Sequence, residues 1–111
     1  MKNTDDFELP ASSPAREIAE TIINFVTARL GEAPDGGGCR AFYDSEEWAQ
    51  RGERYGRGAP LVVVHDGGDL AAIFNIDYEC YDANEALTQA LGAIGYYPEQ
   101  INSWSTAIWP Q

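Results

Sequence analysis

The stretch VVVHDGGDL contains the residues whose types and spacing most resemble those of a catalytic or metal-binding site. It places the single histidine, His65, beside Asp66 and close to Asp69. A histidine with two carboxylates can act in acid–base catalysis or hold a metal ion. Nucleophilic catalysis would also need an activated serine or cysteine. A zinc site would need further nitrogen or sulfur ligands, and a calcium site would need an ordered run of oxygen ligands. The sequence shows none of these patterns, so we expect no catalytic residue, metal site or cofactor.

The local structure predicted for this stretch is a β-hairpin. Residues 61–64 form a β-branched run, residues 70–81 alternate in hydrophobicity, and Asp-Gly-Gly-Asp between them is typical of a turn. With Gly67 and Gly68 at the turn, His65 would lie half-buried at the rim of the core face. That core face would carry Leu70, Ala72, Phe74, Ile76, Tyr78 and Cys80.

The opposite face of the predicted hairpin changes from apolar to acidic along its length. Residues two apart on one strand face are about 6.7 Å apart, a spacing comparable to that of neighbouring backbone phosphates. Asp77 and Glu79, with Asp82 and Glu85 just beyond, therefore predict a phosphate-like row. A solvated strand edge protected by charge is the alternative. The apolar part of this face would consist of Val62, Val64, Ala71 and Ile73.

The distribution of charge indicates the kind of partner. The net charge is -11, and residues 59–111 contain seven acids with no Lys or Arg. Such a surface repels nucleic acid and anionic membranes and attracts basic protein surfaces. Acidity that serves only solubility is the alternative. We therefore predict a basic protein partner, with no direct binding of nucleic acid or membrane. The predicted contact residues are Asp66, Asp69, Asp77, Glu79, Asp82, Glu85 and Trp109.

Two further motifs bear on nucleotide or nucleic-acid binding. The glycines at 36–38 lack the Lys-Ser or Lys-Thr of a phosphate loop. Arg51, Arg54 and Arg57 form the one basic patch, which favours either a nucleic-acid contact or, as the plainer interpretation, local pairing with neighbouring acids.

The cysteines and the apolar runs of the sequence indicate the cellular compartment of the protein. Cys39 and Cys80 lack CxxC or metal-ligand neighbours, the N-terminal residues show no signal-peptide core, and no run is long enough to span a membrane. We expect a cytoplasmic protein with free thiols, and a disulfide between the two cysteines is the alternative.

The remaining patterns predict helices around the hairpin. A helix from Pro14 to Leu30 would have Ser13 as N-cap and Gly31 as its end. Two later helices, at 44–55 and from residue 82 to Gly95, begin with capping-box patterns. Residues 39–43 and 100–109 are expected to be strands.

These elements predict a flexible tail over residues 1–12 and one α+β domain over residues 13–111. The domain would contain a small antiparallel sheet of three to four strands and about three helices. The expected order is β-α-β-β-α-β, preceded by the N-terminal helix.

Three segments carry a resemblance: FYDSEEWAQRGERYG, LVVVHDGGDLAAIFN and YECYDANEALTQALGAIGYY. They are similar to short uncharacterised proteins of bacteriophages and prophages. The resemblance implies a small accessory protein in the cytoplasm of a bacterial host, of the sort that includes anti-CRISPR and anti-restriction inhibitors.

The expected function is therefore a non-enzymatic acidic inhibitor, a nucleic-acid mimic that binds a nuclease or CRISPR effector subunit. An immunity protein or antitoxin for a cognate nuclease is a close alternative. A self-associating module that uses the apolar hairpin face is a second alternative. An enzyme that acts through His65, Asp66 or Cys80 is the last alternative.

Overall fold

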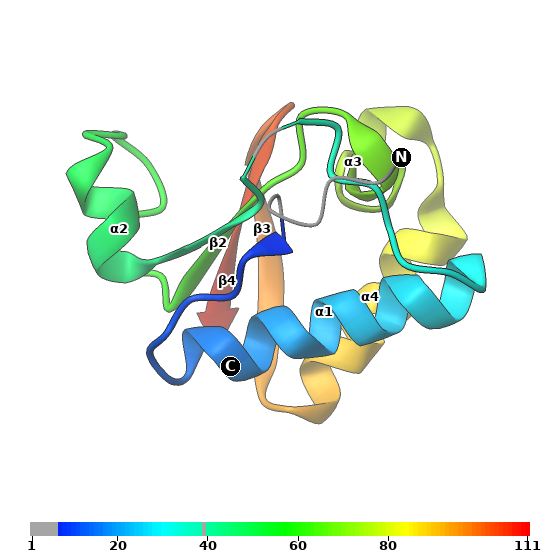
Figure 1. Ribbon diagram of the computed structural model, residues 1–111, viewed down its shortest axis with the longest axis horizontal. Coiled ribbons are helices and arrows are strands. Elements are labelled where there is room, and N and C mark those ends of the chain that lie inside the picture. The colour runs from blue at the N-terminus through cyan, green and yellow to red at the C-terminus, as the bar shows by residue number, and fades with distance from the viewer. Residues whose placement is uncertain (1–6, 39) are drawn as a thin grey trace.

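The computed structural model describes residues 7–38 and 40–111, and its centre is a four-stranded antiparallel sheet (Figure 1). The strands are β1 (Phe42–Asp44), β2 (Leu61–Val64), β3 (Tyr96–Asn102) and β4 (Ser105–Pro110), in the order β1-β2-β4-β3. The helices are α1 (Ala15–Leu30), α2 (Ser45–Gln50), α3 (Gly68–Phe74), α4 (Tyr81–Ala93) and the short 3₁₀ helix η2 (Ile76–Tyr78). The predicted α+β class, antiparallel sheet and N-terminal helix are confirmed.

The hairpin predicted over residues 61–81 is wrong. β2 pairs instead with β1 and β4, so that Val63 lies opposite both Phe42 and Thr106. The chain after β2 turns into α3 and then η2. Leu70, Ile73 and Phe74 are buried, and their spacing of three and four residues is that of a helix. The alternation of the sequence in this region therefore did not reflect strand structure.

The sheet's hairpin lies at the C-terminal end of the chain. The prediction of one strand over residues 100–109 is wrong, because β3 and β4 pair in this region, with Glu99 opposite Ala107. Pro98 is tolerated in β3 because that strand lies at the edge of the sheet. After α1 the order is thus β-α-β, two α-helices with a 3₁₀ helix between them, and a hairpin, rather than β-α-β-β-α-β.

Helix ends follow the sequence signals in part. The capping box of α2 is confirmed, since Asp44 and Glu47 exchange side-chain and backbone hydrogen bonds, although the helix ends at Gln50 rather than near residue 55. Gly31 ends α1 in the left-handed conformation, as predicted. Ser13 does not cap α1, and its hydroxyl instead donates to the Glu17 carboxylate at 2.6 Å.

The capping box predicted for α4 does not form. The N-cap of this helix is Cys80, and no side-chain hydrogen bond caps it. Asp82 lies in the first turn of α4, where a carboxylate is favoured by the positive end of the helix dipole.

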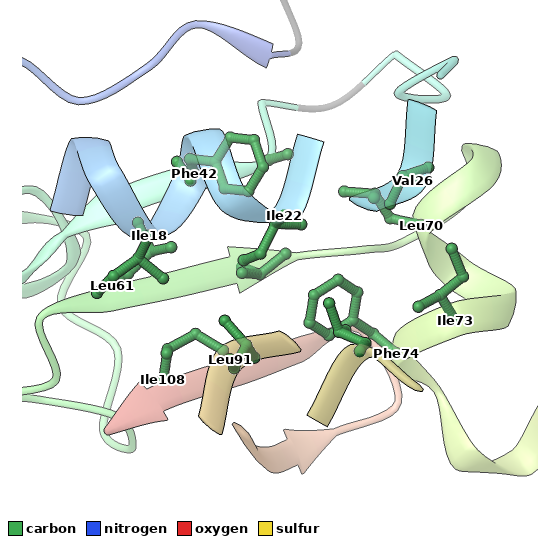
Figure 2. Packing of buried hydrophobic residues seen from close by; sticks show 14 of the residues in the cluster. Ile18, Ile22, Val26, Phe42, Leu61, Leu70, Ile73, Phe74, Leu91 and Ile108 are labelled. Atoms are coloured by element: carbon green, nitrogen blue, oxygen red, sulfur yellow. The ribbon is translucent and has the colours of Figure 1, made fainter. Parts of the chain in front are cut away.

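Alternate residues of β2 point into two separate apolar clusters. Leu61 and Val63 belong to the main core, which α1, α3 and α4 cover (Figure 2). Val62 and Val64 belong to a smaller cluster on the other face, built around Trp48 of α2. The predicted apolar face for self-association therefore does not exist, because Val62, Val64, Ala71 and Ile73 lie on different elements and little of any of them is exposed.

The start of the described chain is packed. Phe7 and Leu9 contact the main core, the Phe7 ring lies 6.1 Å from that of Phe42, and Pro10 is buried. Packing thus extends into the segment predicted as a tail, at least from Phe7. Residues 1–6 and Cys39, on which parts of the tail, disulfide and strand predictions fall, lie outside the described residues. Within the described chain, the helices are too short or too polar to cross a membrane.

Candidate functional site

His65 lies just after β2, and the structure buries it more deeply than predicted. Only 2% of the residue is exposed, its Nε2 atom is 2.9 Å from the Thr106 hydroxyl, and its ring stacks on Phe74 at 5.3 Å. Burial lowers the pKa of His65 to about 4, so the imidazole is neutral at pH 7. His65 is thus a neutral ring that packs inside the protein.

The two aspartates near His65 take different positions. Asp69 accepts a hydrogen bond from the Asp35 backbone N–H at 2.6 Å and donates its own N–H to the Asp35 carbonyl at 2.8 Å. Asp69 thereby ties its loop to the glycine-rich loop at 35–38, whereas Asp66 is exposed beside Arg40. Within residues 7–38 and 40–111, no three His, Cys, Asp or Glu side chains are placed to hold a metal ion.

Each of the three arginines of the predicted basic patch makes a different contact with its neighbours in the chain. Arg51 places its guanidinium 5.0 Å from the ring centres of both Tyr43 and Trp48, and 3.3 Å from the Glu53 carboxylate. Arg54 lies over Tyr55, and Arg57 donates to the Glu53 carbonyl. Local contacts are thus what the structure shows for all three arginines, although within the described chain only Arg51 pairs with an acidic side chain as the plainer interpretation predicted.

Arg51 also lines a pocket of about 540 Å³ with Arg40, Tyr43, Val64, Asp66 and Trp104. Arg40 is already paired with Glu47, and Trp48 donates its indole N–H to the Tyr55 carbonyl at 2.7 Å. These contacts hold α2 and the loop after it against the sheet.

Replacing Arg51 with alanine should lower the free energy of unfolding by about 1 kcal/mol, because a partly buried guanidinium stacked on aromatic rings contributes about that much. Urea denaturation measures the change. The control is Arg54→Ala, which removes a contact with one exposed ring and should cost less than about 0.5 kcal/mol. Equal losses in both variants would show that Arg51 does not hold α2 in place.

Four of the predicted contact residues do gather on one surface. Asp77 lies in η2, Glu79 follows it directly, and Asp82 and Glu85 lie in the first turns of α4. All four are exposed. They do not form the predicted row along a strand, because this segment is not a strand. Exposed apolar side chains lie among them. We call this the acidic–tyrosine surface, and it consists of Ile76, Asp77, Tyr78, Glu79, Tyr81, Asp82 and Glu85.

Asn75 and Gln100 hold the start of this surface, at Ile76 and Asp77, in place. The buried side chain of Asn75 accepts from the Asp77 N–H at 3.0 Å and from the Gln100 amide at 3.1 Å, and it donates to the Ser103 carbonyl at 3.0 Å. Gln100 in turn accepts from the Ile76 N–H at 3.0 Å. Neither residue was predicted from the sequence, although Asn75 two residues before Asp77 is the spacing of an Asx turn.

The tyrosines and one strained residue shape the same surface. Ile76, Tyr78 and Tyr81 are 50%, 55% and 57% exposed. Glu79 adopts the left-handed conformation, with φ of 59° and ψ of 23°, which is uncommon for a residue other than glycine. The segment therefore presents large apolar groups to solvent from a fixed backbone.

Trp109, the remaining predicted contact residue, lies apart from this surface. It is half-buried in β4, packs against the Trp48 cluster and donates its indole N–H to Glu99 at 3.1 Å. Its contacts are those of a side chain that helps to cover the sheet. The structure thus brings together four of the seven predicted residues and separates Asp66, Asp69 and Trp109 from them.

Comparisons with known proteins give no match to a family model, a curated protein or a solved structure. The function is therefore inferred from the chain's own residues.

Proposed function

We propose that this protein is a non-enzymatic inhibitor that binds the basic surface of a nucleic-acid-handling protein, such as a nuclease or a CRISPR effector subunit. The acidic–tyrosine surface is the contact. The observation that carries the proposal is the combination of four exposed carboxylates with three exposed apolar side chains on one pinned segment.

Electrostatics supports a basic partner. No Lys or Arg follows Arg57 in the sequence, so all the charged Lys, Arg, Asp and Glu side chains after that residue are negative. Carboxylates attract the same Lys and Arg side chains that a nucleic-acid-binding protein uses for phosphates. The inhibitor would thus compete with nucleic acid for one surface.

The tyrosines support a protein partner rather than solubility alone. Tyr78 and Tyr81 can bury large rings against a partner, keep their hydroxyls hydrogen-bonded and stack with cationic side chains. A surface that served only solubility would not need exposed aromatic rings next to a turn whose backbone is fixed by a buried asparagine. An enzymatic role has less support, because the only histidine is buried and neutral.

The test begins with capture from a bacterial lysate that contains CRISPR and restriction systems. Immobilised protein at low salt should retain a nucleic-acid-handling protein that rising salt and competing DNA both release. The retained protein is identified, and its cleavage of DNA is then titrated with the inhibitor. Failure to inhibit any captured enzyme would overturn the proposal.

Charge reversal locates the contact. The double variant Asp77→Lys and Glu79→Lys should weaken binding of the identified partner at least about tenfold, because attraction becomes repulsion at the contact. The matched control, Glu8→Lys with Glu46→Lys, makes the same change in net charge at two exposed sites outside this surface. Equal weakening by both pairs would mean that net charge, and not this surface, drives binding.

A further inference from the structure

A pocket of about 450 Å³ opens within the acidic–tyrosine surface, between α3 and the start of α4. Ala72, Ile73 and Ala83 give it apolar walls, and the carboxylate residues Glu79 and Asp82 also line it. Such a lining combines a lipophilic interior with negative charge. The volume falls within the range of small ligand sites in proteins, roughly 300–1,000 Å³.

We propose that this pocket receives one lysine or arginine side chain of the basic partner, an inference that rests on the proposed function. Lysine and arginine both carry a cationic head on an aliphatic stem, and the stem packs well against apolar surface while the head stays at a polar edge. The stem would lie along Ala72, Ile73 and Ala83, and the head would meet Glu79 and Asp82. The complementarity is thus one of shape and of charge.

The protein's own Arg29 also lines the pocket, from the last turn of α1. Arg29 is exposed, and among the described residues the structure shows no ion pair between it and either Glu79 or Asp82. The two carboxylates therefore keep their capacity to bind an incoming cation. A positive charge at this edge opposes a second one, so Arg29→Ala should tighten binding of a cationic side chain.

The probe for the test is a capped tetra-arginine peptide, with tetra-lysine as a second arm and tetra-norleucine as an uncharged control. Titration followed by amide NMR shifts should show saturable changes at residues 72–83 with both cationic peptides. The norleucine peptide should give none. Shifts spread evenly over all exposed acids would overturn the proposal.

A variant that fills the pocket distinguishes insertion of a side chain into the pocket from general attraction of the peptide to acidic residues. Ala72→Leu leaves the charge unchanged, occupies the pocket, and should weaken tetra-arginine binding at least about tenfold. Ala49→Leu, at an exposed position in α2, is the matched control and should bind as the unaltered protein does. Glu79→Gln with Asp82→Asn should also weaken binding, and it guards against a leucine variant that fails to fold.

The outcomes distinguish this inference from the proposed function. If Ala72→Leu binds the peptide and the captured partner normally while Asp77→Lys with Glu79→Lys does not, the surface is used without the pocket, and only the inference fails. If no partner is inhibited although the peptide occupies the pocket, the proposed function fails.

Discussion

The substitution Gly68→Ala is expected to lower the free energy of unfolding by about 3 kcal/mol or more, because two backbone segments meet at Gly68 without room for a side chain. Gly68 has φ of +67°, and a Cβ atom would stand 2.4 Å from the Asp35 carbonyl oxygen. Gly37 faces it with the same restriction, since its Cβ would stand 2.6 Å from the Gly68 nitrogen. Backbone atoms cannot move aside as a flexible side chain can, so the loops at 35–38 and 67–69 would have to separate.

The control for this prediction is Gly31→Ala. Gly31 also has a positive φ, +78°, but apart from Gly31 and its two chain neighbours no heavy atom of the described chain lies within 4 Å of the position that an alanine methyl group would take. Its replacement should cost only the strain of the left-handed conformation, about 1 kcal/mol. Urea denaturation of both variants gives the comparison. A loss at Gly68 no larger than at Gly31 would contradict the close approach of the two loops.

Stability should fall as the pH is lowered from 6.5 towards 4, by about 3 kcal/mol in total from His65 alone. The folded protein holds the pKa of His65 at about 4, chiefly through burial, whereas the unfolded chain has the ordinary value of 6.5. Between these values the unfolded state binds a proton that the folded state does not. The stability that neutral His65 provides is therefore fully present above pH 6.5 and is lost as the pH falls from 6.5 to about 4.

The measurement is the free energy of unfolding in urea at intervals from pH 7 to pH 5, a range above the ordinary pKa of most carboxyl groups. His65→Phe keeps a ring that can stack on Phe74 and removes the titration. The variant should be less dependent on pH over this range, even if the loss of the Thr106 contact lowers its stability throughout. The same slope in both proteins would assign the pH dependence to other groups.

Local signals in the sequence were sufficient where the structure depends on neighbouring residues. The capping box of α2 and the glycine end of α1 formed as predicted, because their partners lie within four residues. The strand assignment at 70–81 failed because Leu70, Ala72 and Phe74 alternate while Leu70, Ile73 and Phe74 also match a helix. In the structure Gly68, at the start of α3, packs on Asp35, which is far away in sequence, and no local pattern contains this contact.

The candidate site was predictable to a similar extent. Charge and polarity indicated that Asp77, Glu79, Asp82 and Glu85 would be exposed, and they are. Asp69 carries the same side chain as Asp66, yet its hydrogen bond to Asp35 spans 34 residues and could not be read from its neighbours. The support of the surface by Gln100 depends on β3 lying beside η2, which follows only from the assembled sheet.

The position of β2 within the sheet has a consequence for synthesis on the ribosome. β2 is an inner strand whose four residues are all buried, and its two neighbours are β1, about twenty residues earlier, and β4, more than forty residues later. A nascent chain can pair β2 with β1 early, but the other edge of β2 stays open until β4 has been translated and released. During that interval the chain exposes an apolar strand edge of the kind that favours association with other chains.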